Sequence, residues 1–134
     1  MKKFYAIVLA IGFLTMGAIE AKSTEPKNEP APPKFVTLLK DGTVEAGTTV
    51  QFSFRIRGTP VPEIKVYFNE TEIDFENQTR YRLYNEFGYI TFIINDAQPE
   101  DSGVYSFKIT NYLGTETMKV SLKVTEKEND NYYF

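Results

Sequence analysis

The residue types present in this sequence restrict its chemistry before any fold is considered. None of the 134 residues is His or Cys. Histidine is the commonest general base and transition-metal ligand, and thiolate catalysis, disulfides and zinc thiolate sites all need cysteine. A carboxylate pair can serve a glycosidase, but the acidic residues fall mostly in turns and at positions expected to be solvated. We therefore expect a binding protein that uses no cofactor or metal, and not an enzyme.

The absence of known functional motifs and the overall charge further restrict the functions and partners that we expect. The sequence contains no D-x-D-x-D calcium loop, glycine-rich phosphate loop or Gly-x-Ser-x-Gly elbow. Its formal net charge is −3, so it lacks the basic field that attracts nucleic acids. The class of partner expected is a protein, not DNA or RNA.

Two short motifs could carry a covalent modification. Asn69-Glu70-Thr71 and Asn77-Gln78-Thr79 both match the acceptor pattern for N-glycosylation. In a secreted protein we expect Asn69 and Asn77 on exposed loops along one edge of the domain. The pattern is short and often arises by chance, so the sequence leaves open whether either site is occupied.

The elements that position these residues are strands. Strict alternation of apolar and polar residues predicts a half-buried strand over residues 50–57, and shorter alternating runs follow along the chain. No segment shows a sustained helical period. The predicted turns contain Gly, Pro, Asn and Asp, and Asn111 and Gly114 of the last turn suit the positive φ that tight hairpins require. Seven or so short strands of this kind predict an all-β antiparallel sandwich.

The two ends of the chain differ in composition from the strand-forming residues between them. Residues 1–21 have two lysines directly after Met1, then an apolar run, and small residues at Ala18 and Ala21, which predicts a secretory signal peptide. An uncleaved signal anchor is the alternative. Residues 22–33 carry four prolines and predict an extended tether, and residues 126–134 predict a flexible tail. After cleavage no remaining segment is apolar enough for stable membrane insertion.

A family resemblance covers residues 31–125. Asp101, Gly103 and Tyr105 form a D-x-G-x-Y pattern that resembles the tyrosine corner of immunoglobulin domains. Other stretches at the right spacing resemble intermediate-set (I-set) domains of titin, twitchin and cell-adhesion proteins: Pro32–Phe35, Glu45–Thr48, Gly58–Glu63 and Thr110–Gly114. The resemblance implies a single immunoglobulin-like β-sandwich over residues 34–125.

The chain departs from that family at its central core. Phe54 and Phe107 stand where the family usually has its two cysteines, and Val66 stands where it has a tryptophan. The absent disulfide removes a contribution of about 2–5 kcal/mol. Two facing phenylalanines offset part of this loss, and the smaller valine frees volume for them. We therefore expect Phe54 and Phe107 to touch, with Val66 beside them.

Recognition is expected on one sheet face. The alternation places outward a tyrosine among lysines and hydroxyls, which suits an acidic protein partner: Lys65, Tyr67, Lys108, Thr110 and Lys119, with Ser106 among them. An ordinary solvated face is the alternative. The resemblance also implies a structural ion pair between Asp101 and either Arg80 or Arg82.

The sequence thus predicts a secreted, extracellular adhesion module that binds a cell-surface or matrix protein. A structural immunoglobulin domain of muscle or matrix is the alternative, since disulfide-free cores are routine in the cytosol and unusual in small secreted domains. The sequence leaves open whether the chain forms a homodimer.

Overall fold

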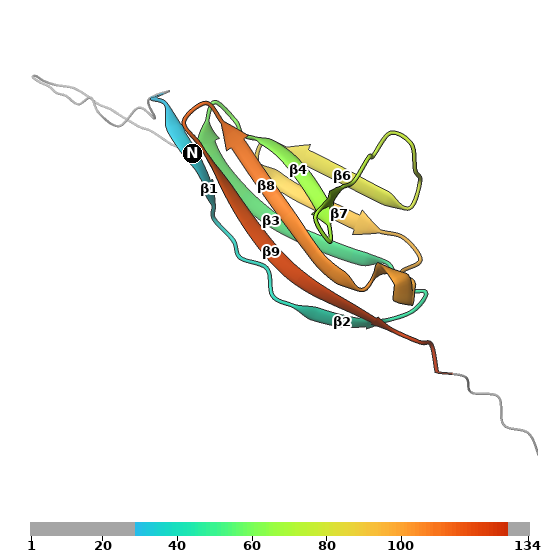
Figure 1. Cartoon of the computed structure of the whole chain (residues 1–134). Coiled ribbons are helices and arrows are strands. Elements are labelled where there is room, and N and C mark those ends of the chain that lie inside the picture. Colours follow the sequence, from blue (N-terminus) through green and yellow to red (C-terminus); the bar gives the residue numbers. More distant parts are fainter. Residues whose placement is uncertain (1–28, 129–134) are drawn as a thin grey trace, which may run out of the picture.

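The structure is a computed structural model that describes residues 29–128 (Figure 1). The predicted signal peptide, most of the predicted tether and the end of the tail lie outside the described residues. Within them the strands are β1 (Ala31–Phe35), β2 (Gly42–Glu45), β3 (Val50–Thr59), β4 (Glu63–Phe68), β5 (Thr71–Glu72), β6 (Tyr81–Glu86), β7 (Tyr89–Ile94), β8 (Gly103–Asn111) and β9 (Gly114–Thr125), with one 3-10 helix, η3 (Pro99–Asp101).

The strands form two sheets packed face to face (Figure 1). One sheet has the order β1-β3-β7-β6 and the other the order β2-β9-β8-β4-β5. Neighbouring strands are antiparallel except β2 and β9, which run parallel. This is an all-β sandwich, as the alternating pattern predicts.

The first strand includes three residues of the predicted tether, Ala31 to Pro33. β1 lies at the edge of its sheet, where a proline that cannot donate a hydrogen bond is tolerated. The pairing of β1 with β3 is irregular between Ala31 and Lys34, and Pro33 is buried.

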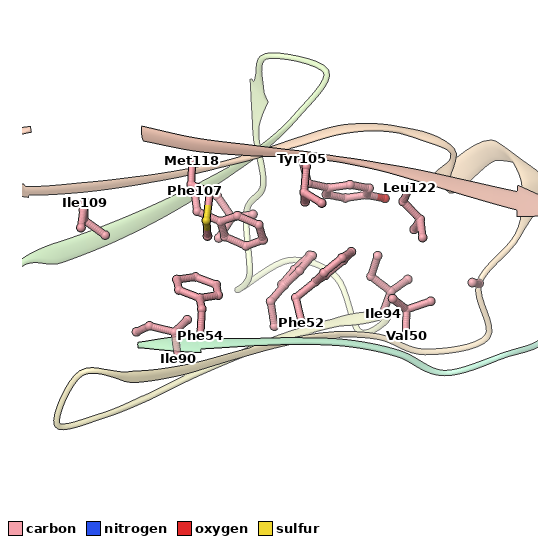
Figure 2. Packing of buried hydrophobic residues seen from close by; sticks show 14 of the residues in the cluster. Val50, Phe52, Phe54, Ile90, Ile94, Tyr105, Phe107, Ile109, Met118 and Leu122 are labelled. Carbon is pink, nitrogen blue, oxygen red and sulfur yellow. The ribbon is translucent and has the colours of Figure 1, made fainter. Parts of the chain in front are cut away.

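The core lies between the sheets because each strand turns every second residue inward. Phe54 of β3 and Phe107 of β8 point at each other across the gap, with ring centroids 4.9 Å apart (Figure 2). Val66 is paired with Phe107 in the register of β4 and β8 and is fully buried. Offset and edge-to-face rings at such distances contribute beyond the burial of area alone.

Phe92 is the centre of the aromatic core. Its ring lies within 6.0 Å, between centroids, of five other aromatic rings: Phe52, Phe75, Tyr81, Tyr105 and Phe107. These rings come from both sheets and from the segment between β5 and β6. Aromatic side chains therefore fill the centre of the sandwich between the two sheets.

Two hairpin turns differ in backbone conformation. Phe87 and Gly88, between β6 and β7, have φ of 55° and 88°, and a Cβ on Gly88 would lie 2.7 Å from the carbonyl oxygen of Ile56. Glycine is therefore required there.

In the β8–β9 turn the expected positive φ is absent at both Asn111 and Gly114. The Asn111 side chain stabilises that turn instead: its Oδ1 accepts from Leu113 N at 2.9 Å, and its Nδ2 donates to Ala31 O at 2.8 Å.

Candidate functional site

The predicted binding residues lie together on the outer surface of the five-stranded sheet. We call Lys65, Tyr67, Lys108, Thr110 and Lys119 the lysine face. Lys65 of β4 is directly opposite Lys108 of β8, and Ser106 stands between Tyr67 and Lys119 in the register. Their neighbours in sequence, including Val66, Phe107 and Val120, point into the core, so alternation fixes the direction of all five.

The lysine face is mainly a polar, cationic surface. Lys65 Nζ lies 4.0 Å from Glu72 Oε2, and both side chains are about half exposed, so this ion pair adds little stability. Thr110 Oγ1 and Thr115 Oγ1 are 3.2 Å apart. Tyr67 is only partly exposed. The face can attract carboxylates, and it contains no group arranged for covalent chemistry.

Ser106 corrects one detail of the predicted face. It was expected at an exposed outward position, but it is buried, with 8% of its surface accessible. Its outward direction is retained, because its register partners are Tyr67 and Lys119. Those two long side chains flank the small serine, and their bulk explains its burial.

A second cluster of polar residues lies where η3 meets the start of β6, and its role is to stabilise the fold. Asp101, 3% exposed, accepts hydrogen bonds from Gln98 N at 2.7 Å, from Tyr81 Oη at 3.1 Å and from the Arg80 guanidinium in a two-point contact. The partner is thus Arg80, whereas Arg82 donates to Thr79 O at 3.0 Å. These four hydrogen bonds occupy the acceptor positions of the Asp101 carboxylate. The carboxylate therefore has little remaining capacity to bind a ligand.

The ionisation of this group follows from its contacts. Burial raises the pKa of the Asp101 carboxyl, but the Arg80 guanidinium, the Gln98 amide and the Tyr81 hydroxyl outweigh it, and the net pKa is below the usual value. The hydrogen bond to Asp101 in turn raises the pKa of Arg80. Burial, with the nearby Asp101 charge, raises the pKa of Tyr81. Asp101 is therefore ionised at neutral pH and holds the loop, η3 and β6 together.

The tyrosine corner is the next contact along the chain. Tyr105 Oη donates to Asp101 O at 2.7 Å, and the Tyr105 side chain is fully buried. Burial raises the pKa of this hydroxyl, so it stays protonated. Gly103 leaves room for Asn69, because a Cβ there would lie 2.6 Å from Asn69 Oδ1. These residues fix the path of the chain into β8.

We expect Tyr105→Phe to lower the free energy of unfolding by about 1–2 kcal/mol, because it deletes one buried hydrogen bond and leaves the Asp101 carbonyl unpaired. Urea unfolding at pH 7 measures the change. Tyr112→Phe is the matched control, since Tyr112 is 71% exposed, and its effect should stay within about 0.5 kcal/mol. Equal midpoints for both variants would mean that the buried hydroxyl adds no net stability.

The two sequon asparagines lie at exposed positions on either side of β5. Asn69 Oδ1 accepts from Val104 N at 2.9 Å, and Asn77 Nδ2 donates to an Asp74 carboxylate oxygen. Each side chain thus already has a role in local structure, the first at the start of β8 and the second in the loop after β5.

Sequence reasoning missed a group of exposed aromatic and basic residues on the other sheet. Tyr84 of β6 and Tyr89 of β7 are about half exposed, and Phe87 between them is 96% exposed. The available signal was the same alternation: Ile90, Phe92 and Ile94 define the inward side of β7, so the residues between them must face outward.

Residues 29–128 contain no cluster of three or more acidic side chains placed to hold a metal ion. No helix in this part of the chain is long and apolar enough to cross a membrane.

Comparison with known proteins identifies the family. The model of the immunoglobulin I-set domain matches residues 33–124. Titin of Drosophila melanogaster is 37% identical over 109 residues, covering 81% of this chain and 1% of that protein. The muscle M-line assembly protein unc-89 of Caenorhabditis elegans is 32% identical over 106 residues, covering 79% of this chain and 1% of that protein.

Solved structures agree in fold. A chimeric titin Z1Z2 carrying a decorin peptide superposes with a TM-score of 0.69 at 35% identity, covering 74% of this chain and all of that one. The titin domains Z1Z2 in complex with telethonin give a TM-score of 0.69 at 34% identity, covering 75% of this chain and 50% of that one. The chain spans only a small part of the full-length relatives that it matches.

These relatives overturn one expectation. The prediction of a secreted, extracellular protein is wrong. The relatives are a titin, a muscle M-line assembly protein, a cardiac-type myosin-binding protein and a smooth-muscle myosin light chain kinase, and these muscle proteins point to a location inside the cell. N-glycosylation needs the secretory pathway, so the correction also removes the basis for expecting glycans on Asn69 and Asn77.

A sandwich with a tyrosine corner, a parallel β2–β9 pair and a matching family model over most of its length places this chain in the immunoglobulin I-set family.

Proposed function

We propose that this chain is a muscle-type structural immunoglobulin domain that binds a filament protein and performs no catalysis. The observation that carries the proposal is the similarity to titin, unc-89 and the myosin-binding proteins over 69–81% of the chain. The described residues begin and end at opposite ends of the sandwich (Figure 1), an arrangement that suits a domain lying in series with others.

We assign the filament contact to the lysine face. Lys65, Lys108 and Lys119 project from three adjacent strands of a rigid sheet, and a chain with net charge −3 needs such a local cationic surface to approach an acidic partner. Fixed lysines on strands lose little backbone freedom on binding. The surface therefore suits a carboxylate-rich part of a filament.

The test is co-sedimentation of the full chain with muscle myosin filaments, because myosin-binding proteins C and H are among the relatives. We expect the chain to pellet with myosin, and Lys65→Glu with Lys108→Glu to reduce the bound fraction at least fivefold. Telethonin, the partner in one similar titin structure, is the second probe. If the chain binds neither myosin filaments nor telethonin, the proposal is wrong.

A further inference from the structure

We propose that the outer surface of the β1-β3-β7-β6 sheet is a second docking surface, which binds an acidic, extended segment of a partner protein. It lies on the opposite side of the sandwich from the lysine face, so it stands apart from the proposed filament contact. We call it the arginine–aromatic face: Lys34, Arg55, Arg57, Tyr84, Phe87 and Tyr89.

Strand register brings these residues together. Arg55 of β3 is paired with Tyr89 of β7, and Glu86 of β6 lies on the other side of Tyr89. One row further, Tyr84 is paired with Thr91. At the β1 edge Lys34 is paired with Arg57. The residues between them in sequence, among them Phe54, Ile56 and Ile90, are buried, so the face points away from the core.

The aromatic rings of this face are unusually accessible. Tyr84 is 49%, Tyr89 58% and Phe87 96% exposed. Tyrosine, phenylalanine and arginine are enriched in protein interfaces, and tyrosine and arginine dominate their binding energy. The Arg55 guanidinium lies over the Tyr89 ring, 4.9 Å from its centroid. This stacking holds both side chains in place before a partner arrives.

Phe87 is a second, independent sign of a contact surface. It occupies the β6–β7 turn with φ of 55°, a conformation in which asparagine or glycine is favoured and a bulky side chain is rare. The fold gains almost no burial from its ring. A ring presented in this way at the end of a sheet face can enter an apolar pocket of a partner.

The charge of the face selects the partner. Lys34, Arg55, Arg57 and Arg82 are all exposed cations on this side, and Glu86 is the carboxylate among them, which gives a local charge of about +3 on a chain whose net charge is −3. Within residues 29–128 the ion pairs are Lys65–Glu72 and Arg80–Asp101, so these cations have no carboxylate partner there. Arginine binds carboxylates in two-point contacts.

A protein segment fits this surface better than a membrane does. The cations and tyrosines stand on paired strands of a sheet. Of the three exposed rings of this face, one, Phe87, carries no hydroxyl and suits insertion into lipid. An extended chain of carboxylates that includes one apolar residue would match the spacing of side chains along strands.

The experiment titrates the full chain into a fluorescent 12-residue peptide of Asp and Glu with one central Phe. The reference peptide has Asn and Gln in place of the acids. We expect the acidic peptide to bind at least tenfold more tightly, with affinity that falls as salt rises. Arg55→Glu with Arg57→Glu should weaken it at least tenfold, and Tyr84→Ala with Phe87→Ala about fivefold.

The matched control is Lys40→Glu with Lys127→Glu, which replaces two exposed lysines outside both faces and changes the net charge by the same amount. Its peptide affinity should stay within twofold of the original chain. Equal losses for the two charge variants would mean general charge attraction and overturn the proposal, as would equal binding of the two peptides. Self-association abolished by Arg55→Glu with Arg57→Glu would assign the face to a second copy of the chain and also overturn it.

Two further measurements separate loss of binding from loss of folding, and protein binding from lipid binding. Thermal unfolding shows whether the variants fold, and Arg55→Gln with Arg57→Gln replaces the charge reversal if they do not. Vesicles containing phosphatidylserine test the lipid alternative, and tighter binding to them through the same residues would overturn the proposal. Failure of the peptide test with myosin co-sedimentation intact would remove this inference alone and leave the proposed function standing.

Discussion

Phe107→Ala is expected to lower the free energy of unfolding by about 3–5 kcal/mol, because truncation removes a large buried ring and leaves a cavity. Phe107 is fully buried and its ring lies 4.9 Å from Phe54, 5.7 Å from Phe92 and 6.1 Å from Phe52, between centroids. Two rigid sheets cannot close over the space. Urea unfolding followed by tyrosine fluorescence gives the change.

Phe87→Ala is the matched control for that substitution. It deletes the same atoms from a residue that is 96% exposed, and surface truncations usually change stability by less than about 0.5 kcal/mol. Similar losses for the two variants would contradict the view that the aromatic core replaces the missing disulfide. A loss above about 3 kcal/mol for Phe107→Ala alone supports it.

Asp101→Ala is expected to lower the free energy of unfolding by about 3–5 kcal/mol, because it breaks a buried ion pair by removing one partner. The substitution leaves the Gln98 amide and the Tyr81 hydroxyl without their acceptor and the Arg80 guanidinium without its carboxylate. Arg80→Ala should cost less, since the Arg80 side chain is 42% exposed and the carboxylate keeps two donors. Chemical denaturation at pH 7 compares the two, and the reverse order would contradict this account.

The same carboxylate gives stability a dependence on pH. The pKa of Asp101 is lowered in the folded protein, so its contribution is present above the unfolded value of about 4 and is lost as the pH falls through the folded value. The chain should therefore lose stability as the pH falls below about 4 and through the lowered pKa of Asp101. In Asp101→Asn the acid-dependent loss should be smaller, and equal slopes for both proteins would assign it to other carboxylates.

Core residues were predictable because alternation is a local property of strands. Once residues 50–57 are taken as a strand, Phe52, Phe54 and Ile56 must share one face, and they do. The position of Asp101, Gly103 and Tyr105 in a recognisable pattern also placed the Tyr105 hydroxyl near upstream backbone. Neither step needs knowledge of which strands are neighbours.

The choice between Arg80 and Arg82 shows where such reasoning stops. Arg82 lies within β6, where alternation directs it outward, opposite Ile93. Arg80 precedes the strand, and its direction is set by the loop that leads into β6 and by the position of η3. Similarly, the burial of Ser106 depends on the size of Tyr67 and Lys119, which flank it from neighbouring strands.

The sequence alone determined the fold class, the inward residues and the disulfide-free core, because these follow from residue type and a period of two. Only the tertiary structure decided which outward residues gather into surfaces. Lys34, Arg57 and Tyr89 lie on three strands far apart in sequence, and register brings them onto one sheet face. Surface recognition depends on such long-range pairing, and alternation within one strand gives the direction of a side chain but not its neighbours on other strands.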